Sequence, residues 1–220
     1  MLQKKIAKQI DYFSEWKHLI HEGDVLLFKG ESLYSRGLRI GGDSPYTHVG
    51  IASWHNDILE CTEFHEKHGG RTINLENYIK LDSRQVDVFR PIPYFASLSY
   101  DVYSSDVTTT RVKFEGKLVT DCLRSLTGLP YGWKRIWWIA KHKLAGFRLF
   151  YDTSSTLDDT TSSEIVYPVC STALAYCFSK NSYDLVSQRS DEWTEPADIA
   201  RSTRIHKIFN IKKGILRIVG

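Results

Sequence analysis

The chain has 220 residues, 42% of them hydrophobic and 13% aromatic, and its formal net charge at pH 7 is +3. These values predict a single domain over residues 1–220 with a substantial core, and the small net charge argues against a nucleic-acid partner. The N-terminus has no secretory signal pattern, and no segment reaches the roughly 20 apolar residues of a membrane-spanning helix, so we expect a cytoplasmic protein. The four cysteines are widely separated and form no CxxC motif. We therefore expect reduced thiols, no cofactor and no closed zinc site.

The first half of the chain is predicted to contain one helix and three strands. Apolar residues recur every three or four positions over residues 2–20, which predicts an amphipathic helix within residues 1–22 that braces the core. Three short apolar or β-branched runs follow, and they predict strands at residues 25–29, 46–52 and 58–62. Because only a short turn separates the last two runs, we expect them to form a hairpin.

The second half is predicted to alternate between strands, loops and helices. Residues 85–89 and 205–211 have the pattern of strands, and residues 114–126 place their apolar side chains on one side of a helix. Residues 100–112 are rich in serine, threonine and aspartate, which favours a loop. Residues 191–200 predict a turn with a short helix.

Residues 131–151 interleave aromatic residues with lysine and arginine. The first interpretation is a core helix whose basic residues face water. The second is an aromatic-lined substrate groove that includes Trp133, and the third is an element in weak contact with a membrane surface. The sequence leaves all three open.

Cys170 lies at the predicted start of a buried helix. Pro168 ends the preceding extended segment, and the residues from Ala173 to Phe178 are helix-favouring and mostly apolar. At a helix N-terminus, unpaired N–H groups and the positive end of the helix dipole stabilise a thiolate, which is the nucleophilic form of the side chain. Cys170 is therefore a candidate nucleophile, although a lone cysteine in an apolar segment is also an ordinary core residue.

A cysteine nucleophile needs a general base, and His48 is the best placed of the eight histidines. The other seven lie in predicted turns, loops or charged segments. His48 lies inside an apolar strand, where an imidazole needs hydrogen-bonding partners. The base in turn needs a third group that fixes its orientation.

The third group depends on the length of the hairpin loop. Side chains of paired strands share a face only in the register that the loop imposes. A three-residue loop places Glu60 on the face of His48, whereas a two-residue loop of Asn56 and Asp57 places Glu63 there. Glu60 has apolar neighbours and is expected to be buried, where a carboxylate needs a partner, so it is the preferred acid and Glu63 is the alternative.

Five motifs, in chain order, resemble the permuted papain-like amidases of the YaeF/YiiX type: GDVLLF, PYTHVGIA, ILEC, GLPYGW and YPVCSTALAY. These amidases form a branch of the NlpC-like cysteine peptidase superfamily, to which lecithin retinol acyltransferase is more distantly related. The resemblance implies an α+β fold of the circularly permuted, papain-like kind. Such a fold has a central antiparallel sheet or small barrel packed against helices, one of which starts at Cys170.

The resemblance also implies a catalytic triad in which Cys170 is the nucleophile, His48 the general base and Glu60 the orienting acid. The implied activity is that of a thiol hydrolase, amidase-like or peptidase-like, or of an acyltransferase that forms a thioester acyl-enzyme. The implied substrate is a cell-wall peptide or a lipid-linked acyl or amide group. Tyr46, two residues before His48 on the same strand face, is a candidate oxyanion donor beside the Cys170 backbone N–H.

Two interpretations without this chemistry stay open. The first is a non-catalytic binding module on the same fold. The second is a metal site in which Cys61, His65 and His68 share a loop that His55 approaches, although their spacing matches no closed zinc pattern.

Overall fold

The computed structural model describes residues 9–29, 44–81, 85–100, 107–132, 169–187 and 189–219. Trp133 and nearly all of residues 131–151 lie outside these ranges, so the interpretations of that segment stay predictions. Within the described ranges, none of the helices has the length and apolar character needed to span a bilayer.

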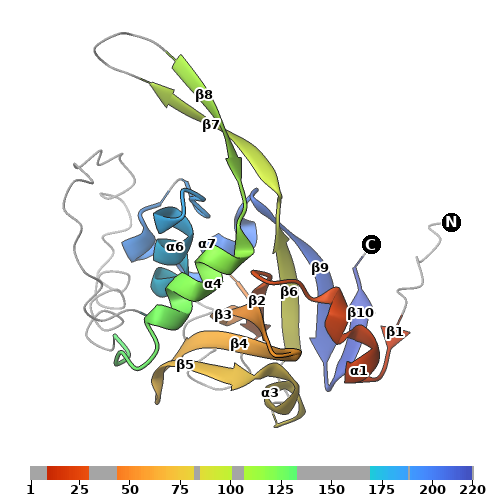
Figure 1. Ribbon diagram of the computed structural model, residues 1–220. Coiled ribbons are helices and arrows are strands. Elements are labelled where there is room, and N and C mark those ends of the chain that lie inside the picture. The colour runs from red at the N-terminus through yellow and green to blue at the C-terminus, as the bar shows by residue number, and fades with distance from the viewer. Residues whose placement is uncertain are drawn as a thin grey trace, which may run out of the picture.

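The fold is of the α+β class and is built on one large antiparallel sheet (Figure 1). Its eight strands lie in the spatial order β1 (Gln9–Ile10), β10 (Ile215–Ile218), β9 (Ile205–Lys212), β6 (Gln85–Pro91), β2 (Val25–Lys29), β3 (Tyr46–His55), β4 (Ile58–His65) and β5 (Gly69–Asn74). Every neighbouring pair is antiparallel. All five strands predicted from the sequence belong to this sheet, and β1, β5 and β10 extend it.

Helices lie on both sides of the sheet (Figure 1). One side carries α4 (Gly116–Ser125), α6 (Cys170–Lys180), η3 (Asp191–Trp193) and α7 (Pro196–Arg201). Side chains of α4, α6 and α7 pack there in one core cluster with Leu27 and Val49. On the other side, α3 (Leu75–Leu81) contributes to a second core cluster that contains Trp16 and Phe28. Because Leu27 and Phe28 point to opposite clusters, β2 is buried on both faces, which explains its uninterrupted apolar run.

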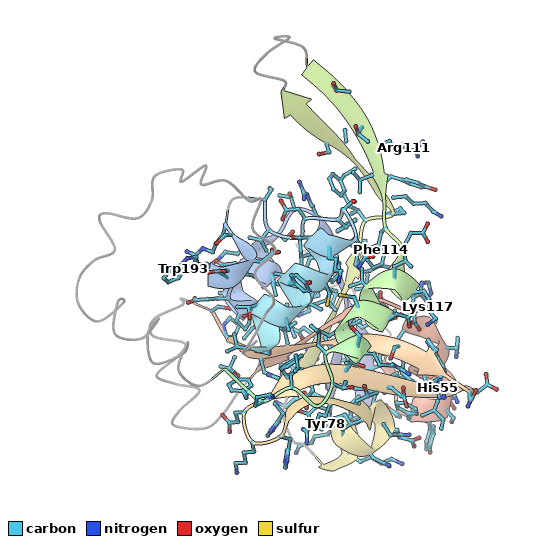
Figure 2. The ribbon with its side chains drawn as sticks, turned by 60° about the vertical axis from the view of Figure 1, so that its left-hand side comes forward. His55, Tyr78, Arg111, Phe114, Lys117 and Trp193 are labelled. Carbon is cyan, nitrogen blue, oxygen red and sulfur yellow. The ribbon has the colours of Figure 1, made fainter. Side chains whose placement is uncertain are left out.

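Two further strands, β7 (Tyr94–Tyr100) and β8 (Val107–Lys113), form an antiparallel ribbon that projects from the body of the fold (Figure 1). The prediction of a loop over residues 100–112 is therefore wrong for residues 107–112, which belong to β8. Threonine is β-branched and favours strands, although several hydroxyls in a row also suggest a loop. Figure 2 shows Arg111 on the ribbon and Phe114 at its base. The Phe114 ring stacks on Phe178 of α6, with ring centroids 5.6 Å apart, and this contact anchors the ribbon to the core.

The N-terminal segment differs from the predicted amphipathic helix. β1 pairs with β10 at the edge of the sheet, and within residues 9–22 helix is confined to α1 (Phe13–Trp16) and the 3-10 turn η1 (Lys17–Leu19). Strand pairing at a sheet edge satisfies backbone groups of both chain segments, and here it outweighs the helical pattern. The segment still packs on the core as predicted, because Trp16 and Ile20 are both buried.

Candidate functional site

The turn between β3 and β4 determines which acidic residue lies beside His48. It is a two-residue turn in which Asn56 and Asp57 both have positive φ, at 46° and 61°, as hairpin turns of this length favour. The register that follows pairs Gly50 with Glu63. Since Gly50 and His48 are two residues apart on one strand, Glu63 lies on the face of the sheet that carries His48.

Glu63 is a fully buried carboxylate whose oxygens are held by three side chains. Its Oε2 lies 2.6 Å from Nε2 of His48. Its Oε1 accepts hydrogen bonds from Nε and Nη2 of Arg71 at 2.8 and 2.6 Å. Tyr78, which α3 holds below the sheet in Figure 2, donates its O–H to Oε2 at 3.3 Å. This set of contacts fixes the position of the carboxylate and, through it, the orientation of the imidazole.

Glu60 lies on the other face of β4, so the prediction that it orients His48 is wrong. It pairs with Ser53 across the hairpin, and its carboxylate accepts a hydrogen bond from Nη2 of Arg124 at 2.7 Å. The reason is the turn length, because a loop shorter by one residue reverses the faces of all residues on β4. Glu63, the alternative acid, takes the position beside His48.

Arg71 and Tyr78 are not singled out by the sequence. Arg71 lies on β5 directly opposite Glu63. The glycine pair that begins β5, followed by Arg-Thr-Ile, is a weak strand signal that could have indicated a third antiparallel strand here. Tyr78 lies on a short helix with no comparable signal.

Because Gly50 has no side chain, Glu63 on the neighbouring strand has room to lie close to β3. A methyl group at this position would lie 2.7 Å from Sγ of Cys61 and 3.3 Å from Cβ of Glu63. The first distance is shorter than any ordinary van der Waals contact, so a larger residue would displace one of these neighbours.

Cys170 is the first residue of α6 and lies beside β3 at the point where β4 stops pairing with it. The β3–β4 ladder ends at Glu63. Beyond it, the backbone N–H groups of Val49 and Ser171 donate hydrogen bonds to the Cys170 sulfur. Because the N–H groups of a strand point along the plane of its sheet, the sulfur lies level with the strands. There it hydrogen-bonds with the imidazole of His48.

The first turn of α6 is held by two hydroxyl groups. Thr172 Oγ1 accepts a hydrogen bond from the backbone N–H of Val169 at 3.0 Å, which satisfies one donor at the helix start. Ser171 Oγ donates to the carbonyl of Thr194 at 2.6 Å. Both bonds are buried, so the helix start that presents Cys170 is fixed to its surroundings.

The side chains of Cys170, His48 and Glu63 stabilise one another's charges. Burial disfavours charge on His48, but the charges of Cys170 and Glu63 and hydrogen bonds to both outweigh it and raise the pKa of His48 to about 10. Burial is likewise outweighed at Glu63, where His48 and Arg71 lower the pKa to about 2. At Cys170 the charge of His48 and hydrogen bonds from its ring and from two backbone N–H groups outweigh burial, and the pKa lies below the ordinary 9.0. The site therefore makes the thiolate of Cys170 more accessible and stabilises the imidazolium of His48.

The other cysteines have different environments. Burial raises the pKa of Cys61. The sulfurs of Cys122 on α4 and Cys177 on α6 lie 2.7 Å apart, and this hydrogen bond lowers the pKa of Cys122. The same contact, together with burial, raises the pKa of Cys177. Cys61 and Cys177 are thus internal references for thiols that are not activated.

Tyr46 lies on the opposite face of the sheet from His48, so the geometry does not support its predicted role as an oxyanion donor. Phe28 pairs with His48 and Lys29 pairs with Tyr46, which leaves one extra residue of β3 in a bulge. Since Phe28 and Lys29 point to opposite faces, their partners do as well. The Tyr46 hydroxyl donates to Oδ2 of Asp87 at 2.6 Å, and burial together with this bond raises the pKa of the tyrosine.

The loop histidines do not assemble the metal site that the sequence left open. The rings of His65 and His68 lie 5.1 Å apart, but Cys61 is fully buried in a core cluster. Across the part of the chain that the structure describes, no group of three or more His, Cys, Asp or Glu side chains is arranged to hold a metal ion.

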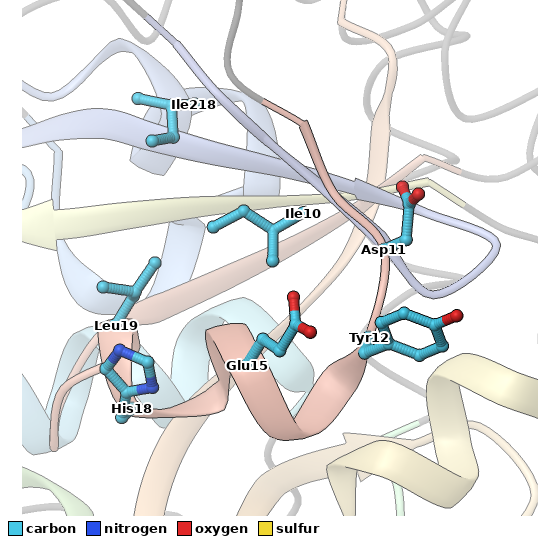
Figure 3. Close-up of a pocket in the computed structure, with 7 residues that line it drawn as sticks. All are labelled: Ile10, Asp11, Tyr12, Glu15, His18, Leu19 and Ile218. Atoms are coloured by element: carbon cyan, nitrogen blue, oxygen red, sulfur yellow. The ribbon is translucent and has the colours of Figure 1, made fainter.

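A separate open pocket of about 690 Å³ lies at the β1 edge of the sheet (Figure 3). Its lining residues come from β1, α1, η1 and β10 and the short stretch between β1 and α1, and they are Ile10, Asp11, Tyr12, Glu15, His18, Leu19 and Ile218. Four strands, β10, β9, β6 and β2, lie between this edge of the sheet and β3, which carries His48. The pocket is therefore distinct from the candidate site.

No protein-family model matches the chain, and no curated protein sequence matches it either. Among solved structures, the crystal structure of the metalloprotein YiiX from Escherichia coli O157:H7 is 12% identical in sequence, with a TM-score of 0.49. The alignment covers 88% of this chain and 97% of that chain. A likeness at this level establishes neither a family nor an activity for this chain.

Proposed function

We propose that the protein is a cysteine hydrolase or acyltransferase that acts on an amide, ester or thioester bond through Cys170, His48 and Glu63. The observation that carries the proposal is the position of His48, which hydrogen-bonds to Glu63 at 2.6 Å and also to Cys170. These are the contacts of a general base with its orienting acid and its nucleophile. Three separate elements, β3, β4 and α6, supply the three side chains.

The acylation step uses the ion pair of Cys170 and His48. The thiolate attacks the carbonyl carbon and forms a C–S bond, while the carbonyl oxygen takes up the negative charge. The N–H groups at the start of α6 are suitable donors to that oxygen. His48 then gives its proton to the leaving nitrogen, oxygen or sulfur as the bond to the carbonyl carbon breaks, and a thioester remains on Cys170.

Deacylation restores the starting state. Neutral His48 takes a proton from water, or from an acceptor hydroxyl or amine in a transferase, and the resulting nucleophile attacks the thioester. The sulfur leaves as a thiolate and His48 is again an imidazolium. Glu63 stabilises that charge throughout, and Arg71 holds Glu63 in place.

The proposal extends to the papain-like character of the fold. A strand histidine that precedes a helix-borne cysteine is the chain order of the permuted papain-like amidases that the sequence resembles, and an acid on the neighbouring strand is part of the same pattern. The antiparallel sheet with α6 packed on one side supports this assignment. On this basis the substrate is a cell-wall peptide or a lipid-linked acyl or amide group.

Trapping the acyl-enzyme tests the proposal. We expect p-nitrophenyl acetate to acetylate Cys170 with a rapid release of p-nitrophenol, detected by absorbance and by mass spectrometry of the peptide that contains Cys170. Both signals should be lost in Cys170→Ala and His48→Ala and retained in Glu60→Gln. Acetylation of Cys170 no faster than that of Cys61 would contradict the proposal and favour a non-catalytic binding module.

A further inference from the structure

A buried carboxylate on the same side of the sheet as α6 contacts two lysines and Tyr46. Asp87 on β6 is fully buried. The Nζ atoms of Lys29 and Lys207 lie 3.0 and 2.6 Å from its Oδ2. The Tyr46 hydroxyl donates to the same oxygen.

Asp87 is fully occupied by donors and neutralises only one of the two lysines. Its Oδ1 accepts hydrogen bonds from the side-chain amides of Gln85 and Asn210. These bonds, with those from Lys207 and Tyr46, outweigh burial and lower the pKa of Asp87 to about 2, so it is ionised at neutral pH. Counted over the residues that the structure describes, two ammonium groups beside one carboxylate leave a net positive charge at this position.

Toward the described part of the chain, both ammonium groups have N–H donors to spare and are accessible. The side chains of Lys29 and Lys207 are each 28% exposed, and an ammonium group carries three N–H donors. Lys29 Nζ also lies over the Tyr46 ring, 5.5 Å from its centroid, which restricts its direction. An anion that reaches this position meets two prearranged cations and need not displace Asp87.

The cluster lies close to the proposed nucleophile. Asp87 pairs with Leu27 across β6 and β2, and Leu27 pairs with Val49 across β2 and β3. The N–H of Val49 donates to the Cys170 sulfur. Two strand spacings of about 4.8 Å each, or roughly 10 Å, therefore separate the backbone of Asp87 from the strand that contacts the sulfur.

We propose that Lys29 and Lys207, held by Asp87, form a subsite for an anionic oxygen group of the substrate, such as a carboxylate. This inference rests on the proposed function and narrows its substrate class. The substrate would be an amide, ester or thioester whose anionic group reaches these lysines while its carbonyl carbon lies at Cys170, across the two strand spacings between β6 and β3.

Binding is tested in the Cys170→Ala variant, which has no nucleophile. The probe is monomethyl suberate, with a carboxylate at one end of an extended chain and an ester at the other, and dimethyl suberate is the neutral control. Calorimetric titration at low salt should show at least about tenfold tighter binding of the monoanion, because hydrogen bonds to charged groups are strong. The difference should decrease as salt is added.

Two substitutions and a matched control locate the subsite. Lys207→Gln and Lys29→Gln, each combined with Cys170→Ala, keep an amide donor to Asp87 but remove one charge, and each should abolish the preference for the monoanion. Lys117→Gln makes the same change in net charge at an exposed position of α4 and should leave the preference intact. Equal binding of the two probes, or a preference that survives both lysine substitutions, overturns the subsite.

Acylation of Cys170, measured beside probe binding, distinguishes a failure of this inference from a failure of the proposed function. If the monoanion binds preferentially but neither p-nitrophenyl acetate nor mono-p-nitrophenyl suberate acylates Cys170 of the wild-type protein, the subsite stands and the proposed function fails. If p-nitrophenyl acetate acylates Cys170 but the two suberate probes bind equally, the proposed function stands and the subsite is refuted.

Discussion

Replacing Glu63 by glutamine is expected to destabilise the folded protein by about 3 kcal/mol at neutral pH. Glutamine has the shape of the neutral carboxyl group but cannot carry the charge that His48 and Arg71 stabilise. Despite opposing burial, those contacts lower the pKa of Glu63 from 4.5 to about 2, and each pKa unit corresponds to about 1.4 kcal/mol. Glu60→Gln is the matched control. Its carboxylate is partly exposed and contacts Arg124, so its loss should cost under about 1 kcal/mol.

Urea denaturation of the three proteins at several pH values provides the measurement. Because folding lowers the pKa of Glu63, the stability it contributes is fully present above pH 4.5 and is lost as the pH falls towards 2. The deficit of Glu63→Gln relative to wild type should therefore be largest between pH 4.5 and 6.5, shrink below pH 4.5, and shrink again as His48 loses its proton around pH 10. A deficit at pH 7 no larger than that of Glu60→Gln, or one that does not change with pH, would refute this reasoning.

Two further substitutions test the surroundings of Glu63. Arg71→Lys replaces two hydrogen bonds to Oε1 by one at most, and we expect a loss of about 1 to 2 kcal/mol in denaturation, together with a higher thiol pKa at Cys170. Arg124→Lys is its control, and an equal effect of both changes on the Cys170 pKa would contradict the role given to Arg71. Gly50→Ala should cost about 1 to 3 kcal/mol because its methyl group meets the Cys61 sulfur. Adding Cys61→Ala should restore part of that stability, and a purely additive double variant would show that the clash is not the cause.

The hairpin of β3 and β4 shows how far residue patterns reach and where they stop. The apolar and β-branched runs are enough to predict both strands and the histidine between them. Whether Glu60 or Glu63 meets His48 depends on one residue of loop length, since Asn56 and Asp57 form a turn without His55. Strand propensity does not depend on that one residue, whereas the face of the sheet on which each β4 side chain lies reverses with it.

The helix start at Cys170 was predictable for a different reason. Proline, small polar residues and an apolar helix follow one another locally, so the element and its first residue can be read from neighbours in sequence. The contact of its sulfur with Val49 and His48 depends on where β4 leaves β3, which is a property of the assembled sheet. For the same reason the bulge that moves Tyr46 away from His48 leaves no trace in the run from 46 to 52.

The most direct test of the central claim is the pH dependence of Cys170 alkylation by iodoacetamide, followed by peptide mass spectrometry in a Cys122→Ser background. That background removes the other thiol whose pKa is lowered. We expect Cys170 to react faster than Cys61 and Cys177 at pH 7, with an inflection below pH 9.0 that moves upward in His48→Ala. If the Cys170 profile is the same with and without the histidine, and no faster at pH 7 than that of Cys61, the imidazole does not hold a thiolate and the account is contradicted.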